Sequence, residues 1–201
     1  MNVYMQTTAR PTNVVRFPYN DFEYIFDYYT DLEIKGTVSA SDTIEDRVVG
    51  VIGISKQIMG RQTARWLRGW IGPTEKRFGN RTDKGHFIAH SIGGGLQLNI
   101  FPQRRDLNRG WSDAGKRYRA MEKYCFDHPG TLCFNRPIYS DVTSKPSAFD
   151  FGFLTEEGSL QVAHFDNSTI NDERNFPTQL AKSFRKHPGN PIAVTDSFQR
   201  A

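Results

Sequence analysis

Side chains that could move protons and offset negative charge gather between residues 83 and 110 of the 201-residue chain. Asp83-Lys84-Gly85-His86 opens this stretch, a glycine-rich connection follows, and asparagine, glutamine and arginine residues close it. A neutral histidine with a pKa of about 6.5 can act as a general base at physiological pH. Amide and carboxylate oxygens suit Mg²⁺, and arginines offset negative charge. These residue types together are suited to the hydrolysis of a phosphodiester, which needs an activated water and stabilised phosphoryl oxygens.

Other chemistries that use similar residues lack an essential position here. His86 and His90 have the spacing of two zinc ligands on a helix, but Phe87 stands where a zinc protease needs its glutamate base. The run Gly93–Gly95 is not followed by the Lys-Ser/Thr pair of a phosphate-binding P-loop. No Gly-x-Ser-x-Gly elbow occurs. The sequence therefore excludes the zinc protease, P-loop and serine hydrolase signatures.

The positive charge of the chain is concentrated in one central segment. The net charge is +4, but residues 56–123 carry fifteen Lys and Arg against five Asp and Glu. Residues 1–55 and 124–201 are both net acidic. Within the basic segment, residues 85–103 contain no charged side chain apart from histidine. A basic face of this kind is the expected footprint of a polyanion, with a solvated surface that binds no ligand as the alternative.

Three ordered motifs carry a resemblance to a known family. They are Asp83-Lys84-Gly85-His86, then Asn99-Ile100-Phe101-Pro102-Gln103, then Leu107-Asn108-Arg109-Gly110, which leads into a segment containing Glu122. In this order the chain resembles the DNA/RNA non-specific endonucleases, whose core is a ββα-metal finger (a His-Me finger). The resemblance extends from about residue 48 to about residue 165. One position departs from the family pattern, since Lys84 replaces an arginine and so loses the bidentate fork that suits phosphate.

The resemblance implies a role for particular positions. It makes His86 the general base, Asn108 the only protein ligand of a Mg²⁺ ion (with Mn²⁺ as a possible substitute), and Asn99 a residue that positions the centre. It makes Glu122 the helix glutamate that binds the metal's waters, although about three more residues precede it than in the family. A transition-state arginine is expected at Arg65, with Arg61 as the alternative. Four basic residues are expected to bind substrate: Lys84, Arg104, Arg105 and Arg109.

The periodicity of the sequence predicts an α+β fold with a mixed or antiparallel sheet around the ββα-metal finger. Strands are expected at residues 22–29, 47–54, 96–100, 131–139, 149–154 and 160–165. Ser112 should cap a helix that runs to about Phe126, and a short basic helix is expected within residues 61–70. We expect an acidic N-terminal extension packed on the core (1–45), a nuclease domain (46–170) and a C-terminal tail (171–201).

Cys125 and Cys133, the two cysteines of the chain, lie eight residues apart at the end of the expected helix and in the following strand. A turn between them could bring them together, so we consider a disulfide and, as the alternative, two buried thiols.

The sequence thus predicts a Mg²⁺-dependent endonuclease that hydrolyses DNA and/or RNA with little sequence preference. The alternative is a nucleic-acid-binding module that has lost catalysis. Compact nucleases of this kind often serve as antibacterial effectors, which would imply a cognate immunity protein with an acidic face. No apolar run long enough to span a membrane and no classical signal peptide is present, so we expect no membrane partner. A cytoplasmic location and delivery by a specialised secretion system both stay open, as does the oligomeric state.

Overall fold

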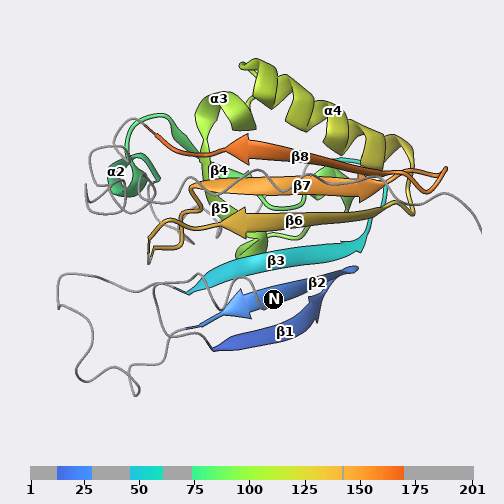
Figure 1. Ribbon diagram of the computed structural model, residues 1–201, viewed down its shortest axis with the longest axis horizontal. Coiled ribbons are helices and arrows are strands. Elements are labelled where there is room, and N and C mark those ends of the chain that lie inside the picture. Colours follow the sequence, from blue (N-terminus) through green and yellow to red (C-terminus); the bar gives the residue numbers. More distant parts are fainter. Residues whose placement is uncertain (1–12, 29–45, 61–73, 142, 170–201) are drawn as a thin grey trace, which may run out of the picture. The chain divides into compact units, whose positions relative to one another are not determined.

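The computed structural model describes residues 13–28, 46–60, 74–141 and 143–169 of the chain (Figure 1). It has an α+β fold in which antiparallel strands predominate over a few helices. The expected basic helix within residues 61–70 and the tail from residue 171 lie outside the described residues. Among the helices of the described part, none has the length and apolar character needed to cross a membrane.

The larger sheet has six antiparallel strands in the order β1-β2-β3-β6-β7-β8. Their bounds are β1 (Val14–Tyr19), β2 (Phe22–Asp27), β3 (Arg47–Ile54), β6 (Leu132–Ile138), β7 (Ala148–Leu154) and β8 (Leu160–Asp166). The strands predicted near residues 22, 47, 131, 149 and 160 are all confirmed. β1 and β2, from the part of the chain assigned to an N-terminal extension, form one edge of the sheet (Figure 1).

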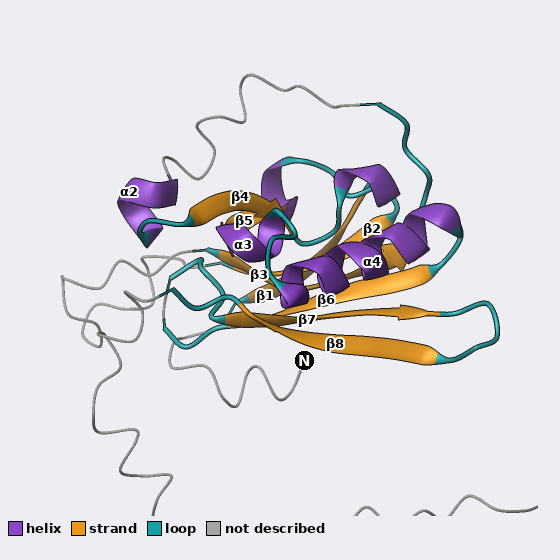
Figure 2. Ribbon diagram, turned by 90° about the horizontal axis from the view of Figure 1, so that it is seen from above, coloured by secondary structure: helices purple, strands orange, loops and turns teal. Residues whose placement is uncertain are grey.

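Helix α4 (Asp113–Asp127) begins where the sequence predicts. Ser112 caps it, since its Oγ accepts a hydrogen bond from the Gly115 amide at 3.1 Å. α4 packs against β7 and β8 (Figure 2). Its buried Tyr118 makes edge-to-face contacts with Phe149, Phe151 and Phe165 of these strands. These aromatic contacts fix the face of α4 that points away from solvent.

A separate two-stranded sheet carries the first two motifs. It pairs β4 (Thr82–His86) antiparallel with β5 (Ile100–Arg104). Two short helices, α2 (Thr74–Phe78) and α3 (Arg105–Asn108), flank it in sequence. The predicted strand at 96–100 is wrong: residues Gln97–Asn99 form a 3₁₀ turn, η4, and the strand begins at Ile100.

The strand β5 also runs beyond residue 100, where the predicted strand ends, and continues through Pro102 to Arg104. Pro102 pairs with Lys84 in the register of the two strands. A proline lacks a donor N–H, but a strand with a partner on only one side can direct that position outward without losing a ladder bond. The two-stranded geometry therefore explains why the strand tolerates it.

Candidate active site

The close packing of β4 on β5 depends on a glycine at position 85. A Cβ added to Gly85 would lie 2.0 Å from Oε1 and 2.5 Å from Cβ of Gln103. No side chain fits there, so the glycine lets the Gln103 side chain cross the neighbouring strand. His86 follows directly at the end of β4 and is half-buried.

The connection from β4 to β5 is held by the side chain of Asn99. Its Nδ2 donates to the carbonyl oxygens of Ile88 at 2.7 Å and Gly95 at 2.6 Å, and its Oδ1 accepts from the Ile88 amide at 2.9 Å. Asn99 is fully buried, and its own carbonyl accepts from the Phe87 amide at 2.9 Å. It therefore fixes the backbone that follows His86, because its side chain bonds to main-chain atoms of this connection.

Three of the residues that the motifs single out, His86, Asn108 and Glu122, line one hollow of about 580 Å³. They come from β4, α3 and α4, and are separated by up to 36 positions in sequence. We call this the His86 hollow. Its other lining residues are Ala89, His90, Ser91, Gln103, Tyr118, Arg119, Lys123 and Phe126.

The imidazole of His86 is neutral over the physiological range. Burial, and to a smaller extent the nearby His90, lower its pKa to about 4. Tyr118 Oη donates to the His86 carbonyl oxygen at 3.2 Å, which ties the end of β4 to α4. A neutral ring nitrogen at the wall of a hollow is able to accept a proton from a bound water.

The pKa of the Glu122 carboxyl is shifted in the opposite direction, upward. Burial raises its pKa to about 7, against a hydrogen bond with Tyr118 and the charge of Arg119, which both lower it. At neutral pH this carboxyl is therefore divided between its two protonation states. A cation that enters the hollow would favour the ionised form.

Gln103 is a residue to which the sequence reasoning gave no role of its own. It is fully buried at the wall of the His86 hollow, and neither Nε2 nor Oε1 has a hydrogen-bond partner among the described residues. Leaving both atoms unpaired is costly unless something in the hollow bonds to them. Its position at the end of a recognisable motif was the only signal in the sequence.

The donor set of this hollow fits a hard cation such as Mg²⁺ or Mn²⁺. Asn108 Nδ2 donates to Asp83 Oδ2 at 3.4 Å, which leaves its Oδ1 as the ligating atom. The Glu122 carboxylate and the unpartnered Gln103 amide add further oxygens that could hold the waters of such an ion. Within the described ranges no three His, Cys, Asp or Glu side chains are grouped to hold a metal.

A second hollow of about 600 Å³ adjoins the first at Asn108, which lines both. We call it the Asp83 hollow. α2, β4 and α3 form it through Thr74, Glu75, Lys76, Thr82, Asp83, Lys84, Arg105, Asn108 and Arg109. Four of these nine side chains are basic and two are acidic, so the lining is net positive.

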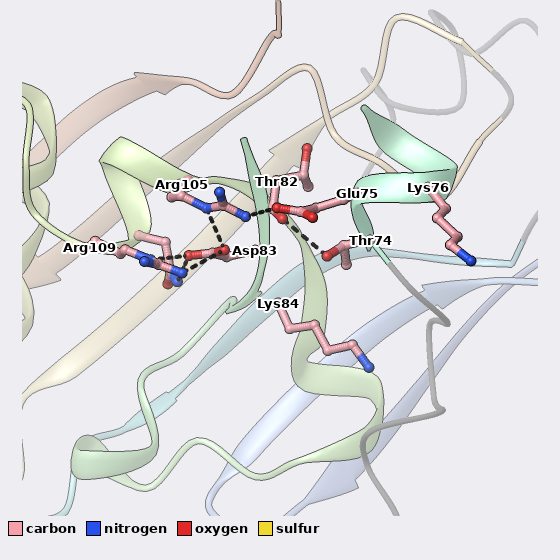
Figure 3. Close-up of a pocket in the computed structure, with 9 residues that line it drawn as sticks. Thr74, Glu75, Lys76, Thr82, Asp83, Lys84, Arg105 and Arg109 are labelled. Atoms are coloured by element: carbon pink, nitrogen blue, oxygen red, sulfur yellow. Dashed lines mark hydrogen bonds and ion pairs between the residues drawn. The ribbon is translucent and has the colours of Figure 1, made fainter. Parts of the chain in front are cut away.

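The carboxylate of Asp83 organises this second hollow (Figure 3). It accepts from Arg109 Nε at 2.6 Å and from Arg105 Nε at 2.9 Å, and Arg105 also pairs with Glu75. Burial alone would raise the pKa of Asp83, but the hydrogen bonds from Arg109, Arg105 and Asn108 outweigh burial and hold the pKa below its usual value. The carboxylate therefore stays ionised and keeps both guanidinium groups at the edge of the hollow.

Three of the four predicted substrate-binding residues line a hollow, and the fourth does not. Lys84, Arg105 and Arg109 line the Asp83 hollow. Arg104 lines neither hollow: its guanidinium pairs with Asp106 and Asp166, each at 2.7 Å. Arg119 and Lys123, which the sequence analysis did not select, line the His86 hollow instead. Their i, i+4 spacing on α4 next to Glu122 was the available signal.

Neither candidate for the transition-state arginine, Arg65 or Arg61, lies within the described residues. Cys125 and Cys133 are both fully buried free thiols in this structure. The Cys125 thiol, by its hydrogen bond to Cys133, and burial together raise the pKa of Cys133. The two cysteines are thus adjacent but unbridged, as in the second of the two arrangements considered.

No known family model matches the chain, and a search of the curated proteins also finds no match.

Proposed function

We propose that the chain is a Mg²⁺-dependent endonuclease that hydrolyses phosphodiester bonds of DNA and/or RNA with little sequence preference. The observation that supports this most is the shared hollow of His86, Asn108 and Glu122. Their residue types are those of a base, a metal ligand and a carboxylate for metal-bound water, and they are the residues that the family resemblance selects. Mn²⁺ is a possible substitute for Mg²⁺, because both prefer oxygen ligands.

We propose further that β4, β5 and α4 form a ββα-metal finger. Two features support it. The antiparallel pairing of Thr82–His86 with Ile100–Arg104 puts the histidine at the end of the first strand. Asn108 and the helix that carries Glu122 then follow the second strand in sequence. The resemblance to the DNA/RNA non-specific endonucleases predicts this order of elements.

In the proposed reaction a ring nitrogen of His86 takes a proton from water as its oxygen attacks phosphorus. The new P–O bond forms as the bond to the leaving sugar oxygen breaks. Asn108 would hold the metal through its amide oxygen, Glu122 would orient water, and Arg119 and Lys123 would offset negative charge on the substrate. Bound Mg²⁺ would supply charge stabilisation at the phosphoryl and leaving oxygens.

The direct test is degradation of plasmid DNA and of a structureless RNA by the purified full chain, with Mg²⁺, with Mn²⁺ and with EDTA. We expect metal-dependent cleavage, and His86→Ala should reduce it about 10²–10⁴-fold, the usual contribution of a positioned base. His164→Ala is the matched control, since that histidine lies on β8, pairs with Asp150 and lines neither hollow.

The same experiment separates the proposal from its alternative. Metal-independent binding of nucleic acid with no cleavage under any of these conditions would identify a nucleic-acid-binding module without catalysis. Cleavage that survives His86→Ala would overturn the site. If cleavage is found, toxicity of the chain on expression in bacteria would test the effector role, and relief by a co-expressed acidic protein would identify the immunity partner.

A further inference from the structure

An exposed tryptophan, Trp111, follows the proposed centre in the chain. The Trp111 side chain is 62% exposed, although tryptophan is usually well covered in folded proteins. It lies three residues after Asn108, in the connection between α3 and α4. Such exposure of the largest side chain, next to a candidate site, needs an explanation.

The backbone that carries Trp111 is firmly held. Its amide donates to the Asp106 carbonyl at 2.8 Å, and the Gly110 amide donates to Leu107 at 3.2 Å. Gly110 adopts φ +70°, a left-handed conformation that favours glycine. Ser112, the cap of α4, follows immediately. The ring is therefore presented to solvent from a fixed backbone.

One face of the ring is paired with a cation. The Arg109 guanidinium carbon lies 4.9 Å from the centroid of the Trp111 ring. Two nitrogens of the same guanidinium donate to Asp83, Nε at 2.6 Å and another at 3.2 Å (Figure 3). Arg109 therefore links the exposed ring to the Asp83 hollow, which it also lines.

We propose that Trp111 and Arg109 form a stacking platform for one unpaired nucleobase next to the bond that is cut. The platform makes the enzyme prefer single-stranded over double-stranded nucleic acid. An aromatic ring stacks on any base, because every base has a π-face, while the bases of a duplex are already stacked on their neighbours. Arg109 also lines the Asp83 hollow, whose basic lining suits the backbone phosphates next to the stacked base. This inference rests on the proposed nuclease function.

The test measures binding with hydrolysis removed. Each variant is made in a His86→Ala background, and its affinity is measured for a labelled oligothymidylate and for a hairpin duplex of similar charge. Trp111→Ala should weaken binding of the single strand about 5- to 150-fold, the range for loss of one base–aromatic stack. Binding of the duplex should change less than the single strand does, and Trp111→Phe should retain most of the affinity.

Leu160→Ala provides the matched control. Leu160 is 61% exposed, an exposed fraction similar to that of Trp111. It lies at the start of β8 and lines neither hollow. Its loss should leave both affinities unchanged. Thermal melting of each variant shows whether the fold is kept.

The outcomes are distinct. Selective loss of single-strand binding in Trp111→Ala, restored by phenylalanine, supports the platform. Equal loss for both substrates, or no loss for either, overturns the platform but leaves the nuclease proposal standing. Failure of the His86→Ala protein itself to bind either nucleic acid counts against the proposed function, and the platform falls with it.

Discussion

His86 and Glu122, which both line the His86 hollow, should give the protein an unusual dependence of stability on pH. Glu122 has a folded pKa of about 7 against an ordinary value of 4.5. Between these values the folded chain holds a proton that the unfolded chain releases, so this contribution to stability is lost as pH rises from 4.5 to 7. His86 has a folded pKa of about 4 against 6.5. The unfolded chain takes up a proton there, so its contribution is lost as pH falls from 6.5 to 4.

Each displacement corresponds to as much as about 3 kcal/mol of unfolding free energy. Because the two act in opposite directions over nearly the same range, they largely cancel in the unmodified chain. A variant that lacks one of the two groups should therefore show the pH dependence of stability that the other group causes. Relative to the unmodified chain, the stability of Glu122→Gln should rise as the pH goes from 4.5 to 7, while the stability of His86→Ala should fall as the pH goes from 4 to 6.5.

Urea unfolding at a series of pH values, in EDTA to exclude metal effects, measures these differences. With a slope of about 2 kcal/mol per molar urea, the midpoint of each variant should move relative to the unmodified protein by roughly 1–2 M across the range. All other titrating groups are common to the three proteins and drop out of the comparison. If the urea midpoints of Glu122→Gln and of the unmodified chain change with pH in parallel, the reasoning about the buried carboxyl is refuted. A rise where a fall is expected would refute its sign.

Other predictions concern metal binding, charge and packing. Excess Mg²⁺ should partly rescue cleavage by Asn108→Ala, which loses a metal ligand, but not by His86→Ala, which loses the base; equal responses in a metal titration would contradict these roles. Arg119→Gln should lower the slope of log affinity against log salt by about 1, whereas Arg104→Gln, whose guanidinium is held by two carboxylates, should change it less; binding in a salt series decides between them. Gly85→Ala should lower the unfolding free energy by about 1–3 kcal/mol, because its Cβ would meet the β5 glutamine at 2.0 Å, and an unchanged thermal midpoint would show that the contact is relieved.

The parts of the fold that the sequence predicts are those set by local patterns. The run Arg47–Ile54 forms β3 because it is β-branched and apolar, and α4 begins at a side-chain cap. The strand predicted at residues 96–100 is wrong because hydrogen bonds to other parts of the chain determine the local conformation there. Their alternation suits a strand, but the Asn99 amide bonds to the backbone of Ile88 and Gly95 and bends this segment into a turn. Only the folded chain brings these partners together.

The candidate site shows the same division. Residue types and order are enough to select His86, Asn108 and Glu122, which the fold brings into one hollow. Charge alone could not tell which arginines face it. Arg104 is drawn to Asp166, 62 residues away, and Arg105 to Asp83, 22 residues away. Such pairings depend on which strands become neighbours, and the sequence pattern carries no sign of them.

The opposite pKa displacements of Glu122 and His86 have one physical origin. Charge is costly in a desolvated hollow, so burial favours the neutral form of each group: the acid holds its proton and the base gives up its own. Between about pH 4 and 7 both side chains are therefore neutral while the hollow holds no ion. A bound dication would reverse the balance for the carboxyl, because its field favours the ionised form, while the imidazole would stay neutral and able to accept a proton. Metal entry would thus create the negative charge that orients water without also protonating the base.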